Sequence, residues 1–381
     1  MFIVFTSSGE KMVTFAVDLL WVRVGKNGGT ESFIRCILDG MHDIDIDFKV
    51  VLLVSRDNKN SFLHYNKDKR FTIYECPVYS SNIKGRVIWQ NLHLRDTLMD
   101  IGITKCFEPV YSMPMVKTRG IEFYTVIHDL QAKHFPKYFS KTRCVWMDFS
   151  WRNTVNKSKK VVAISEYVKK DIIKHYKVES NKIVMIHNPI SISYVDKERA
   201  IELVKEFGLE EDKFFFCVSS LLPHKNLQVL INMMRLRKDD IKLAIVGVGG
   251  PLEEEFRKQI LEFGLESKIC ILPYVSEDIK NALYETCKLF LFPSTFEGFG
   301  MPPVEALLFD KTVITTRCAS IPEVTKNTAV YVDNPRDENE WNDKIDRIDI
   351  YENMNKTISS SYNPYDKKKV VMQYIEMIMK Q

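Results

Sequence analysis

The fold of this chain is decided at residues 292–306, FPSTFEGFGMPPVEA. The apolar run that leads into this stretch, Leu289–Phe292, is typical of a buried parallel strand. Pro302 and Pro303 suit the first turn of a helix, where a missing backbone N–H costs little. The stretch therefore predicts a strand, a glycine-bearing turn and a helix. A helix that begins in this way directs free N–H groups and a partial positive charge at the turn.

The residues of this turn indicate what it could bind. Gly298 and Gly300 have no side chains, so an anion or a sugar could lie against the backbone. Glu297 and Glu305 would repel a bare phosphate, but they suit a ligand that has hydroxyl groups on either side of its phosphates. A nucleotide-diphospho-sugar is such a ligand. The alternative is an ordinary β–α turn in which Glu305 lies on a solvated helix face.

Length and composition restrict the class of protein. The 381 residues favour two domains over one. A net charge of +4 does not demand a nucleic-acid partner, and no apolar run approaches the roughly 18 residues of a membrane span. The eight cysteines are scattered singly, which predicts buried thiols in a reducing compartment. We therefore expect a cytoplasmic protein that binds no nucleic acid.

Two further strand ends are candidate binding positions. Residues 13–17 predict a first strand, and Gly28 and Gly29 follow in a loop that precedes a helix, an arrangement that suits an anion but also suits a simple tight turn. The apolar run 123–127 ends in His128, and ligands of parallel α/β sheets bind at the carboxyl ends of strands. A histidine at this place is either a site residue or a structural one.

Lys225 stands at the start of a predicted helix, 227–236, where it could neutralise a phosphate together with the helix dipole. The glycines of residues 247–250 do not have the G-x-G-x-x-G spacing, so a dinucleotide site is not predicted there. Asp43, Asp45 and Asp47 contain a D-x-D metal motif. Because they precede a strand instead of following one, we expect no metal at these residues.

Residues 133–160 are rich in lysine, arginine and aromatic residues. This composition fits a solvated, partly packed helix pair. It also fits an edge that contacts an anionic membrane surface or a lipid-diphosphate acceptor.

The string E-G-F-G-x-P-x-x-E, which contains Glu297 and Glu305, resembles the signature of the family-4 retaining glycosyltransferases of the GT-B fold. The His128 block and the S-x-P-E-V turn at residues 320–324 are also similar to blocks of that family, and the resemblance runs from about residue 13 to the last helix. It implies an α/β protein of two Rossmann-like parallel-sheet domains facing across a cleft. The expected domains are residues 1–190 for the acceptor, 191–362 for the donor, and a final helix, 363–381, that returns to the first domain. Residues 1–11 resemble an extension.

The resemblance also implies roles for individual residues. The catalytic residues would be His128, Glu297 and Lys225. The donor-binding residues would be Gly28, Gly29, Ser220, Lys225, Tyr274, Val275, Glu297, Gly298, Phe299, Gly300, Met301 and Glu305. Ser220 departs from the family, which usually has an arginine there to grip the diphosphate.

The expected activity is transfer of a hexose, with retention, from a GDP-, UDP- or dTDP-linked donor to a glycan or lipid-linked acceptor. Lys225 and the backbone N–H groups after Glu297 would stabilise the leaving diphosphate, so we expect neither a metal nor another cofactor. The setting that the resemblance implies is bacterial surface-polysaccharide synthesis, with peripheral contact at the inner face of the membrane. Two alternatives are a sugar-nucleotide epimerase and a non-catalytic sugar-nucleotide-binding subunit, and Ser220 is the best support for the second.

Overall fold

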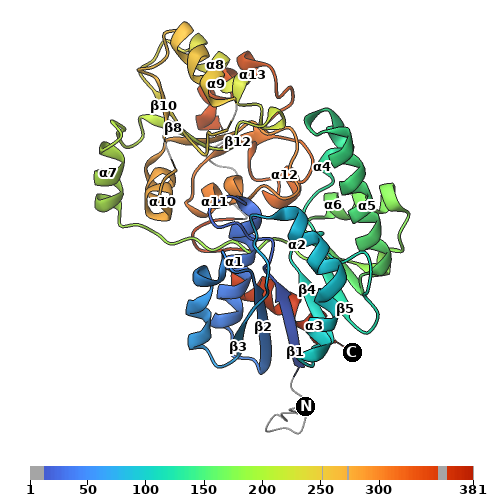
Figure 1. Cartoon of the computed structure of the whole chain (residues 1–381). Helices are drawn as coiled ribbons and strands as arrows, with labels where there is room; N and C mark the ends of the chain where they lie inside the picture. Colours follow the sequence, from blue (N-terminus) through green and yellow to red (C-terminus); the bar gives the residue numbers. More distant parts are fainter. Residues whose placement is uncertain (1–12, 251, 273, 351–357, 381) are drawn as a thin grey trace. The chain divides into compact units, whose positions relative to one another are not determined.

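The computed structural model describes residues 13–250, 252–272, 274–350 and 358–380 (Figure 1). The predicted extension at residues 1–11 lies outside these ranges. The chain divides into two compact units. Unit 1 combines Met1–Pro189 with Tyr365–Gln381, and unit 2 is Ile190–Pro364. The first division thus falls one residue before the predicted boundary at 190, and the second falls two residues after the predicted boundary at 362.

Unit 1 contains a seven-stranded parallel sheet with the order β3-β2-β1-β4-β5-β6-β7. Its strands are β1 (Val13–Asp18), β2 (Phe48–Val54), β3 (Phe71–Glu75), β4 (Lys105–Glu108), β5 (Glu122–Ile127), β6 (Lys160–Ala163) and β7 (Ile183–Met185). The strand order changes direction between β1 and β4, which is the place where doubly wound sheets bind ligands.

The helices of unit 1 include one from the far end of the chain. They are α1 (Gly29–Asp43), α2 (Ile83–Trp89), α3 (Arg95–Asp100), α4 (Gln131–His134), α5 (Lys141–Lys157), α6 (Glu166–Tyr176) and α14 (Lys367–Met379). The last helix, α14, packs on α1. Gly40 permits close contact, because a Cβ there would come within 2.6 Å of Val371. An ion pair of 2.6 Å between Lys367 and Asp43 fixes the start of α14.

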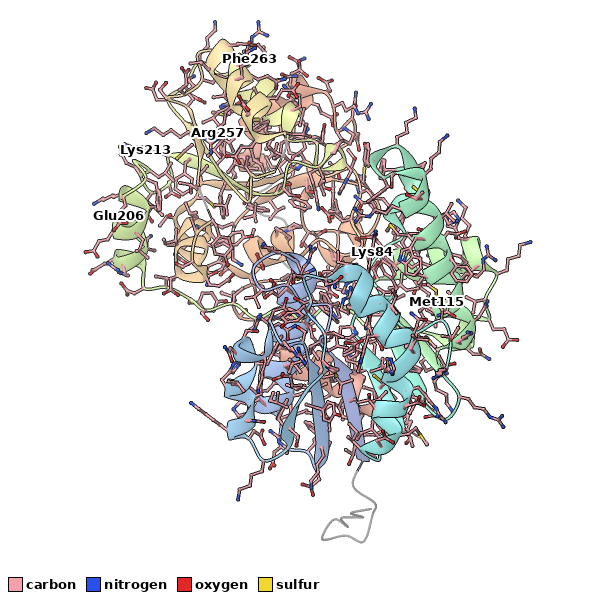
Figure 2. The ribbon with its side chains drawn as sticks, viewed as in Figure 1. Lys84, Met115, Glu206, Lys213, Arg257 and Phe263 are labelled. Carbon is pink, nitrogen blue, oxygen red and sulfur yellow. The ribbon has the colours of Figure 1, made fainter. Side chains whose placement is uncertain are left out.

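Unit 2 contains a six-stranded parallel sheet with the order β10-β9-β8-β11-β12-β13. Its strands are β8 (Phe214–Val218), β9 (Lys242–Val246), β10 (Ile269–Ile271), β11 (Leu289–Phe292), β12 (Val313–Thr316) and β13 (Val330–Val332). Its helices are α7 (Lys197–Lys205), α8 (Leu227–Leu236), α9 (Glu253–Glu262), α10 (Glu277–Thr286), α11 (Met301–Leu308), α12 (Ile321–Val324) and α13 (Glu338–Asp346). Charged side chains such as Glu206 and Lys213 project from its surface (Figure 2).

The sequence pattern located most of these elements. The predicted bounds of β11 and α8 are confirmed. The sequence pattern predicts one amphipathic helix at residues 87–99, and this is wrong in detail, because α2 and α3 are joined by a π-helical turn, Gln90–Leu94. Among the described residues, no helix is both long and apolar enough to cross a membrane.

Candidate functional site

The centre of unit 2 is the junction of β8 and β11. These strands are neighbours, with Leu289 opposite Phe215 and Phe290 opposite Phe216. The strand order changes direction here, because β9 and β10 lie beyond β8 while β12 and β13 lie beyond β11. The loops that leave the carboxyl ends of β8 and β11, residues 219–226 and 293–300, therefore open at the switch point of the sheet.

Lys225 and Glu297 meet at this junction. The Lys225 Nζ lies 2.6 Å from the Glu297 Oε1, although the residues are 72 positions apart in the sequence. Their side chains are only 19% and 12% exposed. The structure thus brings together two of the predicted catalytic residues as a partly buried ion pair.

Backbone hydrogen bonds hold the two loops against each other. The Thr295 N–H and the Thr295 hydroxyl both donate to the carbonyl oxygen of His224, at 2.7 and 3.0 Å. Asn226 adopts a left-handed conformation with φ of 54°, and its side-chain amide donates to the carbonyl of Pro293. The position of Lys225 relative to Glu297 is therefore fixed by hydrogen bonds of the residues on both sides of the lysine, His224 and Asn226.

The glycine-bearing turn is fixed by a residue outside the predicted motif. The buried Ser320 places its hydroxyl 2.9 Å from the carbonyl oxygens of both Glu297 and Phe299. Gly300 then takes a φ of 94°, in the left-handed region that favours glycine, and precedes α11 without a side-chain cap. The Phe299 side chain is buried, so this residue can offer a ligand only its backbone.

The start of α11 has fewer N–H donors than an ordinary helix. A helix leaves its first four N–H groups without intrahelical partners. Two of these positions are Pro302 and Pro303, as predicted, and proline has no N–H. Only Gly300 and Met301 therefore present N–H groups at this helix start.

Glu305 lies on α11 and has two partners that the sequence did not indicate. The Tyr284 hydroxyl donates to the Glu305 Oε2 at 2.8 Å, and the Lys280 Nζ lies 3.6 Å from the Oε1. Burial disfavours the charge of Lys280, but Glu305 and Glu277 together raise the pKa of the lysine above its usual value. Lys280 and Tyr284 are four residues apart on α10, so they share one helix face. Nothing in the sequence shows that this face meets α11.

Two of the remaining predicted residues of unit 2, Ser220 and Tyr274, are exposed. Ser220 is exposed and follows the buried Ser219 at the end of β8. Tyr274 is 93% exposed, whereas Val275 is buried. The predicted role of Tyr274 and Val275 in donor binding stays a prediction.

His128 follows β5 in unit 1. The His128 Nε2 lies 2.8 Å from the carbonyl oxygen of Pro109, and the ring packs edge-on against Phe33 with centroids 4.9 Å apart. Burial lowers the pKa of His128 to about 4, although the hydrogen bond to Pro109 opposes this shift. A carbonyl oxygen can only accept, so the Nε2 carries the hydrogen and the Nδ1 of the neutral ring is an acceptor.

The predicted glycine loop lies in the same unit as His128. Gly28, with φ of 53°, precedes α1, and among the described residues no side chain caps this helix or accepts from the N–H groups of Gly29 and Thr30. The Glu31 carboxylate accepts from the Gly25 N–H at 2.9 Å, which orders the loop. Because α1 also carries Phe33, the glycine loop and His128 are connected through one helix.

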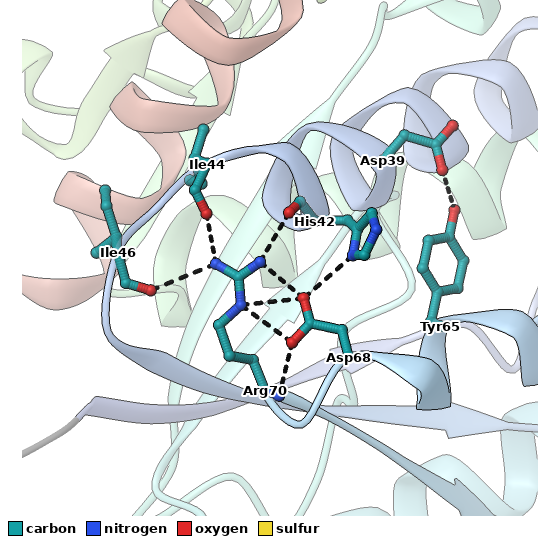
Figure 3. Close-up of polar contacts among 7 residues, drawn as sticks. All are labelled: Asp39, His42, Ile44, Ile46, Tyr65, Asp68 and Arg70. Atoms are coloured by element: carbon teal, nitrogen blue, oxygen red, sulfur yellow. Dashed lines mark hydrogen bonds and ion pairs between the residues drawn. The ribbon is translucent and has the colours of Figure 1, made fainter.

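The acidic patch at residues 43–47 is part of the structural frame. Asp43 pairs with Lys367. Arg70 donates to the carbonyl oxygens of His42, Ile44 and Ile46, which fixes the turn before β2 (Figure 3).

Two family models match the chain. Residues 27–194 match Glycosyltransferase Family 4, and residues 200–361 match Glycosyl transferases group 1. The chain belongs to glycosyltransferase family 4.

Curated relatives of this family-4 chain include O-antigen proteins. It is 29% identical over 240 residues to the O-antigen chain mannosyltransferase RfbU of Salmonella typhimurium, a match that spans 63% of each chain. It is 26% identical to the O-antigen chain mannosyltransferase B of Escherichia coli, over 59% of this chain and 60% of the relative. The matches thus span about three fifths of the length of these relatives.

Solved structures with the same fold cover nearly the whole family-4 chain. Anabaena Alr3699/HepE in complex with UDP and glucose has a TM-score of 0.74 at 18% identity, over 96% of this chain and 99% of that one. WaaG, a glycosyltransferase involved in lipopolysaccharide biosynthesis, has a TM-score of 0.71 at 15% identity, over 96% and 100% of the two chains. The two parallel-sheet units therefore have the GT-B fold.

Proposed function

We propose that this protein is a retaining glycosyltransferase that moves a hexose from a nucleotide-diphospho-sugar to a glycan or lipid-linked acceptor, in bacterial surface-polysaccharide synthesis. The observation that carries the proposal is the ion pair of Lys225 and Glu297 at the switch point of β8 and β11. This pair places a phosphate-binding cation beside a carboxylate that can hold sugar hydroxyls. The O-antigen relatives and the UDP-glucose complex of HepE support the same class of reaction.

The unliganded ion pair suggests how the donor is received. The diphosphate would replace Glu297 as the ion-pair partner of the Lys225 ammonium. The N–H groups of Gly300 and Met301 would donate two further hydrogen bonds to it. Glu297 would then be able to accept hydrogen bonds from hydroxyls of the sugar ring, and Glu305 would hold those of the ribose. The charge that grows on the leaving diphosphate would be stabilised by groups already in place, which needs no metal.

His128 would act as a neutral acceptor. With its Nε2–H donated to Pro109, the Nδ1 can accept a hydrogen bond from a hydroxyl of the donor sugar or of the acceptor. The predicted site has no obvious nucleophile. We therefore propose front-face attack, in which the leaving phosphate takes the proton of the attacking hydroxyl and the anomeric configuration is retained.

The proposal is tested with the purified full chain. Thermal-shift screening against GDP, UDP and dTDP would identify the nucleotide, because a ligand at about 100 times its Kd adds roughly 2.7 kcal/mol of stability. The matching sugar nucleotide would then be incubated with a lipid-linked glycan in EDTA, and NMR would report the anomer formed. We expect transfer with retention.

Other results would contradict the proposal in distinct ways. An epimerised donor in the absence of acceptor would support the epimerase alternative. Tight binding with neither hydrolysis nor transfer would support the non-catalytic subunit, as the exposed Ser220 in place of the family arginine suggests. Loss of transfer in EDTA, with recovery in Mg²⁺ or Mn²⁺, would contradict the metal-independent mechanism.

We also propose that α5 contacts an anionic membrane surface. Three apolar side chains, Val145, Trp146 and Phe149, are 70%, 45% and 55% exposed, and they share one helix face. Together with Lys141 and Thr142 they line a hollow of about 520 Å³. Exposed aromatic and aliphatic side chains beside a basic residue suit the boundary between lipid head groups and acyl chains.

A further inference from the structure

Unit 1 gathers two imidazoles around a buried carboxylate, apart from the residues considered so far. His134 ends α4, while Asp171 and His175 lie on α6. The His134 Nε2 is 2.7 Å from the Asp171 Oδ2, and the His175 Nε2 is 3.4 Å from the Asp171 Oδ1. The three potential ligand atoms all lie within 4.8 Å of one another.

The backbone fixes these side chains without any ion. Asp171 and His175 are four residues apart, so they share a face of α6, and the Ser165 hydroxyl caps this helix by accepting from the Val168 N–H. On α4, Lys133 forms an ion pair of 2.6 Å with Asp148 of α5. Both elements that carry the cluster are therefore held by contacts of their own.

In the part of the chain that the structure describes, no lysine or arginine forms an ion pair with Asp171. The Asp171 side chain is only 7% exposed, and among the described residues its ion pairs are those with His134 and His175. The adjacent cation, Lys133, is engaged with Asp148. A buried carboxylate is costly unless a cation compensates it. A divalent metal between the carboxylate and the two imidazoles would supply that charge.

We propose that His134, Asp171 and His175 form a binding site for a zinc-class metal ion. Imidazole nitrogens with one carboxylate oxygen are a usual ligand set for Zn²⁺, and Zn–N bonds of about 2.0–2.1 Å place tetrahedral ligands about 3.4 Å apart. The present separations of 2.7 and 3.4 Å need only small shifts. The histidines are 27% and 28% exposed, which leaves room for water as a fourth ligand.

The bound ion would tie α4 to α6. Since α4 begins at Gln131, three residues after His128, the ion would restrain the segment that follows this site residue. Its role would be to position the chain, and it would take no part in sugar transfer. Binding needs both imidazoles neutral, with the Nε2 lone pair turned to the metal, so any proton carried on an Nε2 moves to the Nδ1 or to solvent.

The test is metal binding by the chelator-treated full chain. Equilibrium dialysis with Zn²⁺ should give one saturable site per chain, and Co²⁺ in its place should show the visible absorption of a tetrahedral site. Loss of an outer-shell partner typically costs 10–100-fold in metal affinity, so His175→Gln and Asp171→Asn, which remove direct ligands, should each weaken Zn²⁺ by about 100-fold or more. His175→Cys should restore tight binding, because a thiolate is also a zinc ligand.

A matched control exists in the same unit. His42 and Asp68 form a histidine–carboxylate pair of 3.1 Å with a single imidazole (Figure 3). His42→Gln should leave zinc affinity unchanged. The proposal is overturned if the wild type has no saturable site, if His175→Gln binds as tightly as the wild type, or if His42→Gln weakens binding equally. Lys225→Ala should keep the zinc site even if donor binding is lost, so this proposal and that of the transfer activity fail separately.

Discussion

In the unliganded protein Lys225 forms an ion pair with Glu297. Substitution of either residue therefore removes the ion-pair partner of the other as well as an expected contact with the ligand. A diphosphate that binds here replaces one anion beside the lysine with another. The carboxylate that it displaces must find new donors, and hydroxyls of the sugar can supply them. On the proposed function, the pair would therefore favour a ligand with both groups over a nucleoside diphosphate alone.

Lys225→Ala should weaken nucleoside-diphosphate binding by about 1.5 to 3 kcal/mol, the range of a hydrogen bond to a charged group. Binding of the nucleoside without phosphates should change little, because the lysine is expected to contact only the phosphates. Calorimetric titration of both ligands measures the difference. Lys213→Ala removes an exposed lysine that is paired with Glu210, and it serves as the matched control. Equal losses for nucleoside and nucleoside diphosphate would show that Lys225 is structural.

The two glutamates should separate in their effects. Glu305→Gln should weaken both the nucleoside diphosphate and the sugar nucleotide, because Glu305 is assigned to the ribose. Glu297→Gln should not weaken nucleoside-diphosphate binding by more than about twofold yet should slow transfer, since a displaced sugar ring can cost on the order of 100-fold in rate. Titrations with and without the sugar, together with single-turnover rates, measure both effects. If Glu297→Gln weakens the bare diphosphate as much as Glu305→Gln does, the assignment of the carboxylates is wrong.

Single residues also mark the limit of reading this site from sequence. Glu297, Glu305 and Lys225 are found by their place after strands and before helices. Lys280 and Tyr284 support the same site but lie in a segment that has no motif of its own, and Ser320 begins a family-like turn whose contact with the site the sequence does not indicate. Their contribution depends on which helix faces meet, and hydrophobic periodicity does not specify this.

At the scale of elements, the hydrophobic pattern predicted strands and helices correctly where the segment is long or uniformly apolar. β11 is four apolar residues between clear boundaries, and its bounds were predicted correctly. β4 was missed because its four residues, Lys105–Glu108, have charges at both ends. α9 opens with three glutamates and was also missed. Neighbouring strands stabilise such short elements, and that contribution is invisible in a local window.

The apolar face of α5 supports a prediction about a whole helix. Trp146→Ala combined with Phe149→Ser should weaken binding to vesicles that contain anionic lipid, because each change removes apolar area that would enter the bilayer boundary. Cosedimentation with vesicles measures this. The matched control is Tyr362→Ala, which removes an exposed aromatic side chain from unit 2. Unchanged vesicle binding in the double variant would remove α5 as a membrane contact.

For the whole molecule, the two units repeat one design. Each contains a parallel sheet with a switch point. Each also has a histidine in a loop that follows a strand, His128 in unit 1 and His224 in unit 2. Burial lowers the pKa of both histidines to about 4. Both histidines are neutral at physiological pH. The charged form is therefore disfavoured in both candidate regions until the pH falls toward 4.

This arrangement predicts a loss of stability in mild acid. An unfolded histidine binds its proton near pH 6.5, whereas folded His224 binds it only near pH 4, first because of burial and then because of Lys225. Between these two pH values the histidine is protonated in the unfolded state but not in the folded state. The free energy of unfolding is therefore highest above about pH 6.5 and decreases as the pH falls toward 4. Folded His224 should thus cost unit 2 up to about 2–3 kcal/mol over this range.

His224→Gln should remove that share of the pH dependence, while His64→Gln, at an exposed ring, controls for loss of an imidazole. Urea unfolding from pH 7.5 to 4.5, followed by hydrogen exchange in β8 and β11, measures it. A difference between wild type and His224→Gln that does not change with pH would show that His224 accepts its proton without unfolding.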